Sequence, residues 1–252
     1  MSSPELVILL AAAVLAGAMN AVAGGGTLLT FPALLAFGMP SIQANATSTL
    51  ALVVGLVGSA YAYRSHMPVI KPWLLRFGPA SVVGGIVGAW LLTVTPEKTF
   101  SALVPFLLLF ATILFMAQGL VRRWIAFDHQ TARFGVWGIA AQLLIAIYGG
   151  YFGAGIGILM LAAFGLLGFT KIHEMNALKT ILASAINVIA ATYFIMVGLI
   201  AWPQAIVLSV GATAGYFFGA HYSQKIPEAR VRQVVVLIGL LITVSLFWKQ
   251  FA

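Results

Sequence analysis

The chain consists of long apolar stretches separated by short polar segments. The apolar stretches cover residues 6–23, 27–37, 42–63, 73–92, 100–120, 134–152, 156–169, 175–197, 203–221 and 231–247. A helix needs roughly 20 mainly apolar residues to cross the hydrocarbon of a bilayer, and the alternation of period two that a membrane β-barrel requires is absent. The pattern predicts an all-α polytopic membrane protein in which residues 1–252 form a single transmembrane domain.

Composition and charge support a membrane location and exclude several function classes. Hydrophobic residues make up 62% of the chain and charged residues 7%, where soluble domains carry about 25% charged residues. The basic residues lie singly or in pairs between apolar stretches, as in cytoplasmic loops, so nucleic acid is excluded as a partner. There is no Cys, and the four His are widely spaced, so we expect neither a metal nor another cofactor. Because Glu5 is the only charged residue before the first stretch, we expect that stretch to be retained rather than cleaved as a signal peptide.

The two halves of the chain resemble each other. In the first half, Gly24, Gly25 and Gly26 precede a short apolar stretch, and Asn45 lies near the start of the long stretch that follows. The second half has the same order, with Gly153, Gly155 and Gly157 before a short stretch and Asn176 near the start of a long one, 131 positions after Asn45. We interpret this as a duplication, with one repeat over about residues 5–121 and the other over about 133–249. The alternative is chance similarity between glycine-rich membrane helices.

The distribution of Lys and Arg distinguishes two topologies. If each glycine-broken segment crosses the membrane once, seven basic residues oppose six, which is no asymmetry. If each segment is a hairpin that exits on the side it entered, the loops at 64–76, 121–133, 171–179 and 225–232 share one side with eleven basic residues, against Lys98 and Lys249. The second arrangement has the bias expected of a cytoplasmic face. It predicts two inverted repeats, each a glycine-broken helical hairpin plus three transmembrane helices, with both termini periplasmic.

A backbone turn inside a bilayer leaves amide and carbonyl groups that protein, water or a ligand must satisfy, so such turns tend to line a site. Glycines let bare amides approach a ligand, and helices that start at Thr27 and Ile156 would direct their positive dipole ends toward it. This pattern favours an anion. The alternative is that the glycines only allow tight turns and close helix packing.

Polar residues inside the apolar stretches form a second group of candidates. They are Asn20, Asn45, Ser48, Thr49, Asn176, Lys179 and Thr180, in addition to the six glycines and Thr27. Amides and hydroxyls can donate to an oxyanion, and Lys179 would place a charge within a long apolar helix. The alternatives are that Asn45 and Asn176 cap their helices or bond a neighbouring backbone group, and that Lys179 reaches the cytoplasmic head groups.

The five acidic residues fall at termini or loops, which argues against a cation carrier. No nucleophile with a neighbouring base and no metal-ligand spacing is present, so we predict that the protein is not an enzyme.

The segment from Asn20 to Thr27, the Phe31-Pro32 pair, Gly38 and the segment from Ala44 to Ser48 resemble the sulfite exporter TauE/SafE family, with a weaker copy around Gly153 and Asn176. The second half departs from that pattern at Gly155-Ile156-Gly157 and at Ala162. The resemblance implies a transporter of the bacterial inner membrane that exports sulfite, organosulfonates or related small anions. We therefore predict an anion carrier that works by alternating access. The alternative function is a non-transporting membrane subunit that packs against a partner.

Overall fold

The structure, a computed structural model, describes residues 3–22, 25–62, 67–127, 136–169, 171–222 and 228–251. Each predicted apolar stretch forms a helix, so the all-α prediction is confirmed for the described residues. The helices are α1 (Ser3–Val22), α2 (Thr27–Ala36), α3 (Ser41–Ala62), α4 (Met67–Val94), α5 (Glu97–Phe127), α6 (Val136–Tyr151), α7 (Ile156–Leu166), α8 (Ile172–Met196), α9 (Trp202–Tyr222) and α10 (Glu228–Phe251). Several extend past the apolar stretch that predicted them, because main-chain hydrogen bonding continues beyond the apolar window.

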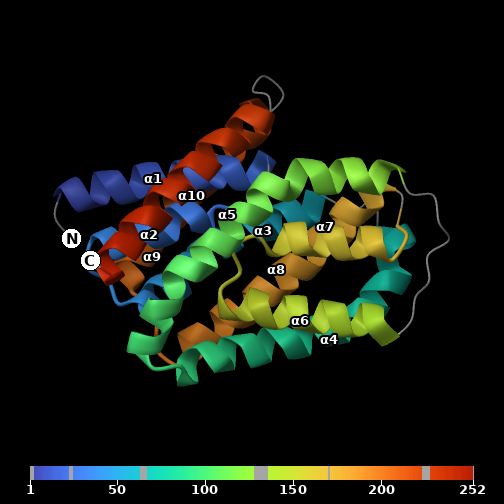
Figure 1. Ribbon diagram of the computed structural model, residues 1–252, viewed down its shortest axis with the longest axis horizontal. Coiled ribbons are helices and arrows are strands. Elements are labelled where there is room, and N and C mark those ends of the chain that lie inside the picture. The colour runs from blue at the N-terminus through green and yellow to red at the C-terminus, as the bar shows by residue number, and fades with distance from the viewer. Residues whose placement is uncertain are drawn as a thin grey trace.

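The two glycine-broken segments form antiparallel helix pairs. Both termini lie at one end of the molecule, where α1 begins, and α2 returns toward that end (Figure 1). The pair α6 and α7 begins and ends at the opposite end, where the side chain of Leu167 lies against Gly138. Each pair therefore turns back inside the molecule, at its glycine break.

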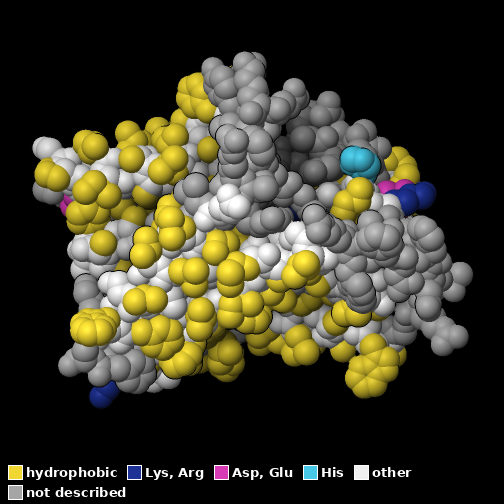
Figure 2. Space-filling view, turned by 45° about the horizontal axis from the view of Figure 1, so that its top comes forward, with side chains coloured by type: hydrophobic (Ala, Val, Ile, Leu, Met, Phe, Trp, Pro, Cys, Tyr) yellow, Lys and Arg dark blue, Asp and Glu magenta, His cyan; other side chains and the backbone are white. Residues whose placement is uncertain are grey.

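Large apolar side chains cover the outer surface between the two ends. Figure 2 shows hydrophobic side chains over much of this face and charged side chains toward its ends. Helix α4 alone exposes Val82, Val83, Ile86 and Trp90, which water would not favour but lipid would. Four described spans are both long and apolar enough to cross a membrane: Ser3–Asn20, Met67–Val94, Glu97–Val121 and Ile172–Met196. The chain is a multi-pass membrane protein.

Close helix packing through glycine holds α4 against α6 and α1 against α9. A β-carbon at Gly84 of α4 would lie 2.7 Å from the carbonyl oxygen of Leu143 and 3.0 Å from the amide nitrogen of Ile147. Gly215 of α9 faces the carbonyl of Val14 and the amide of Ala18 in the same way. Backbones approach this closely only where small residues stand, which is the usual device for helix association in lipid.

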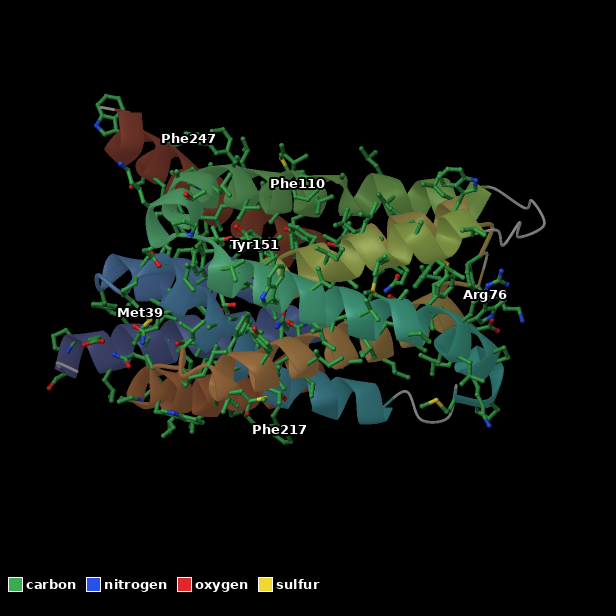
Figure 3. All side chains as sticks on the ribbon, turned by 90° about the horizontal axis from the view of Figure 1, so that it is seen from below. Met39, Arg76, Phe110, Tyr151, Phe217 and Phe247 are labelled. Carbon is green, nitrogen blue, oxygen red and sulfur yellow. The ribbon has the colours of Figure 1, made fainter. Side chains whose placement is uncertain are left out.

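Different contacts hold the two ends of the molecule. At the end with the termini, the Glu97 carboxylate accepts hydrogen bonds from the first amides of α3, at Ser41 and Ile42. At the other end the rings of Trp73 and Phe169 lie 5.0 Å apart. Met39 and Arg76 mark these two ends in Figure 3.

Candidate functional site

The first glycine break joins α1 to α2. Gly24 lies outside the described residues, and Gly25 has φ +92°, in the left-handed region. A β-carbon there would overlap the ring of Phe115 on α5, so neither the conformation nor the space admits a side chain. Gly26 precedes α2, and its amide donates to the Asn20 Oδ1 atom at 2.6 Å. Asn20 therefore ties the end of α1 to the residue before α2, and Thr27, the first residue of α2, is half-buried.

The second break joins α6 to α7. Gly153 and Gly155 have φ values of +80° and +79°, so both positions need glycine. The Tyr148 hydroxyl donates to the Ala154 carbonyl at 2.6 Å and holds the turn. Gly157 lies beyond the turn, in the first turn of α7.

The two breaks meet inside the molecule. The ring of Phe31, from α2, packs edge to face against Phe152 of the second break, with centroids 5.5 Å apart. Helix α5 lies over both breaks, with Phe115 against Gly25 and Leu114 against Gly155. Tyr151, which ends α6, lies near the middle of the long axis in Figure 3. Residues 25–26 and 152–155 therefore share one buried region.

Asn45 connects the first half to the second break. It is the fifth residue of α3, so it does not cap its helix, whereas the alternative that it bonds a neighbouring backbone group agrees with its contact. Its Nδ2 atom donates to the carbonyl of Tyr151 at 3.0 Å, and the side chain is 1% exposed. Its Oδ1 atom has no hydrogen-bond partner among the described residues.

The other polar candidates of α3 have partners nearby. The hydroxyls of Ser48 and of Thr30 on α2 lie 2.6 Å apart, and both residues are buried. The Thr49 hydroxyl donates to the Asn45 carbonyl at 2.8 Å, one turn back in the same helix. Ser48 therefore faces the first turn of α2, and Thr49 is tied to the backbone.

Lys179 lies beside the first turn of α7. A β-carbon at Gly157 would be 3.2 Å from the Lys179 Cδ atom, so the lysine stem packs on that glycine. Its Nζ atom donates to the Asn176 Oδ1 atom at 3.3 Å. Asn176 is the fifth residue of α8, so the cap alternative is wrong here also. Thr180 is half-buried on the same helix.

The candidates therefore divide between the two breaks. Asn20 and Ser48 lie beside the first, whereas Asn45 and Lys179 lie beside the second. Asn187 of α8 also faces the second break, with its Oδ1 atom 3.7 Å from where a β-carbon of Gly153 would stand.

The sequence analysis did not identify three groups that contact the breaks or the candidate residues: the Thr30 hydroxyl, the Tyr148 hydroxyl and the Tyr151 carbonyl. Thr30 could have been noticed as a hydroxyl inside an apolar stretch. Tyr148 and the Tyr151 carbonyl left no signal, because aromatic residues are common in membrane helices and every residue has a carbonyl group.

The surroundings of the second break suit an anion better than a cation. The Lys179 stem packs beside it, the Asn45 amide bonds the Tyr151 carbonyl, and α7 begins there, and helix N-termini favour negative charge. The sequence has no Asp or Glu between Glu5 and Glu97, between Asp128 and Glu174, or between Glu174 and Glu228. The acidic residues of the helices that form the breaks, of α3 and of α8 are therefore limited to Glu5 and Glu174, which lie in the first turns of α1 and α8, away from the breaks.

Comparison with known proteins identifies the family of the chain. Residues 9–246 match the family described as "Sulfite exporter TauE/SafE". A Sinorhizobium protein described as "Probable membrane transporter protein ORF9" is 29% identical, covering 96% of this chain and 92% of that protein. A probable membrane transporter protein of Haemophilus influenzae is 27% identical over 97% of this chain and 95% of its own length. The probable membrane transporter protein YfcA of Escherichia coli K12 is 26% identical over 99% of this chain and 93% of its own length. No solved structure matches the chain. The chain therefore belongs to the sulfite exporter TauE/SafE family, which makes it a membrane transporter and not an enzyme.

Proposed function

We propose that this transporter exports small anions, such as sulfite, organosulfonates or related sulfur oxyanions, across a bacterial inner membrane. The mechanism we propose is alternating access between two inverted repeats. The observation that carries the proposal is the hydrogen bond from Asn45 in the first half to the Tyr151 carbonyl at the glycine break of the second. A carrier of this kind needs its binding site where the two repeats meet near mid-membrane, on interrupted helices.

The helix packing supports the inverted-repeat part of the proposal. The first helix of each half packs on the fourth helix of the other, α1 on α9 and α6 on α4. The third helices also pack on the fourth helices of the other half, α3 on α9 and α8 on α4, while α3 meets α8 and α5 meets α10. The equivalent helices α1 and α6 begin at opposite ends of the molecule (Figure 1). Exchange of equivalent partners is what a two-fold axis in the membrane plane would produce.

Lys179 and its equivalent support an anion site shared between the halves. Ser48 and Lys179 are 131 positions apart, like Asn45 and Asn176, and each lies beside the short helix that follows a glycine break. The site would then be polar on one side and charged on the other. A fixed ammonium in a low-dielectric region attracts an anion strongly.

Ligand-dependent stability separates a carrier from the alternative, a non-transporting subunit. Purified protein in detergent would be melted with sulfite, sulfate, thiosulfate, an organosulfonate, a carboxylate or chloride. A ligand that binds only the folded state stabilises it by about 2.7 kcal/mol at a hundred times its Kd, so a carrier should melt higher with its substrate. A protein that no anion stabilises, and that needs a partner to stay folded, would be the subunit instead.

Transport itself is tested in sealed proteoliposomes loaded with the stabilising anion. Efflux that depends on the protein and is competed by the unlabelled anion supports the carrier. Binding without protein-dependent flux would contradict it.

A further inference from the structure

The amide of Asn45 has one possible orientation. The main-chain carbonyl of Tyr151 can only accept a hydrogen bond, so the amide nitrogen must face it. The Oδ1 atom must therefore point away from that carbonyl. It is an acceptor in a side chain that is 1% exposed, and among the described residues it has no donor.

A buried acceptor without a donor is unfavourable, and native proteins keep few of them. The cost is larger in the interior of a membrane protein, where the local dielectric is low. The cost would be offset whenever a bound ligand supplies a donor. This observation is independent of the glycine turns and of the helix dipole, both of which favour negative charge.

The charge beside the break points to the same kind of ligand. The stem of Lys179 packs on Gly157 while its Nζ atom donates to Asn176, so one positive charge lies close to the start of α7, and the N-terminus of that helix adds a partial one. A singly charged anion would be nearly neutralised there. A dianion would carry unbalanced charge into an apolar region, which is costly.

From the orientation of Asn45 and this charge balance, we propose that the site selects singly charged oxyanions that carry one protonated oxygen, whose O–H donates to the Asn45 Oδ1 atom. The preferred form of sulfite would then be hydrogen sulfite. Fully deprotonated dianions, and monoanions of the same shape without an O–H group, would bind more weakly. The inference rests on the proposed anion transport, since it concerns the ligand of that same site.

The test compares two ligands that differ at one group. Hydrogen sulfite with a protonated oxygen and methanesulfinate are both pyramidal monoanions, and a methyl group of the second replaces the hydroxyl of the first. Affinities are measured by calorimetry on the purified full chain, below the pKa of hydrogen sulfite, so that the monoanion predominates. We expect hydrogen sulfite to bind at least about tenfold tighter, because methanesulfinate leaves the Asn45 oxygen unpaired. Sulfate, a dianion, should bind more weakly than hydrogen sulfite.

Two variants test whether Asn45 causes the preference for hydrogen sulfite over methanesulfinate. Asn45→Leu should bring the two affinities within about twofold of each other, by weakening the binding of hydrogen sulfite. The matched control is Gln142→Leu. Gln142 on α6 is also 1% exposed and donates to the Ser81 hydroxyl of α4 at 2.9 Å, and its oxygen has no partner among the residues that the structure describes. Gln142→Leu should keep the tenfold preference. If Asn45→Leu does not fold, Asn45→Ala is measured in its place.

The outcomes separate this inference from the function on which it rests. Equal binding of the two ligands by the parent protein, or a preference retained in the Asn45 variant, overturns the inference and leaves anion transport standing. If the parent binds none of the three anions and no anion of the melting screen stabilises it, the proposed function fails together with the inference. If another anion stabilises it, the inference alone fails.

Discussion

At the scale of single residues, two glycines with the same unusual backbone differ in their surroundings. Gly25 and Gly38 both have positive φ, at +92° and +77°. A β-carbon at Gly38 would meet nothing within 4 Å, whereas one at Gly25 would overlap Phe115. The pair therefore separates the cost of the backbone conformation from the cost of crowding at the first break.

We expect Gly25→Ala to be more destabilising than Gly38→Ala. Both carry the penalty of roughly 1–2 kcal/mol for a side chain in the left-handed region, and overpacking at Gly25 adds about 1–3 kcal/mol. Melting temperatures in one detergent, together with anion flux, check this. Combining Gly25→Ala with Phe115→Leu should recover part of the loss. Equal melting temperatures for the two single variants would show that Phe115 does not restrict the break.

The second prediction for single residues concerns the charge of Lys179. If it supplies the charge of the anion site, Lys179→Met should weaken anion binding about tenfold or more while the protein still folds, because hydrogen bonds to charged groups are worth about 1.5–3 kcal/mol. Lys179→Arg should retain part of the affinity. The control is Lys171→Met, since the Lys171 side chain is 75% exposed and pairs with Glu174 at 3.0 Å. Parent-like affinity in Lys179→Met would make Lys179 a membrane anchor.

At the scale of helices, the closest approach of α4 to α6 depends on glycine. A β-carbon at Gly88 would overlap the carbonyl of Ile147, a backbone group that cannot rotate away. At Gly85, on the same helix, the nearest atom of Ile186 would be 3.5 Å away, which is ordinary contact.

Gly88→Ala should therefore separate α4 from α6 and lower the melting temperature. Gly85→Ala should be neutral or stabilising by up to about 1 kcal/mol, because Ala favours a helix over Gly. Both variants are melted under the same conditions. A Gly88→Ala protein as stable as Gly85→Ala would mean that this interface can loosen without cost.

At the scale of the whole molecule, the two ends of the helix bundle are predicted to face different compartments. Both termini lie at one end, and Arg76 lies at the other (Figures 1 and 3). The excess of Lys and Arg in the loops of the second end predicts that this end is cytoplasmic.

Single cysteines test that orientation, because the chain has no Cys of its own. Thr99, at the end with the termini, and His173, at the other, are both exposed. In intact cells an impermeant maleimide should label Thr99→Cys and spare His173→Cys until the cells are opened. Labelling of both before opening, or of His173→Cys alone, would contradict the predicted topology.

Hydropathy and glycine were enough to predict the helices and the positions of both breaks. Each helix satisfies its own backbone, and each apolar stretch requires a membrane environment whatever its neighbours are. The positive φ of Gly25, Gly153 and Gly155 is likewise a local property. The family resemblance in the first glycine motif was readable for the same reason, since it lies in consecutive residues.

Tertiary structure alone decided what surrounds those breaks. Asn45 looked equally suited to capping its helix, yet it bonds a carbonyl 106 positions later. Ring packing of Phe115 on Gly25 could not be anticipated either, because nothing in the sequence relates α5 to the first break. A main-chain carbonyl is present in every residue and aromatic residues are common in this chain, so residue type alone identifies neither the carbonyl that Asn45 bonds nor the ring that packs on Gly25. Only the packing of helices from distant parts of the chain brings the Asn45 amide to the break and leaves its oxygen buried with no donor in the part of the chain that the structure describes.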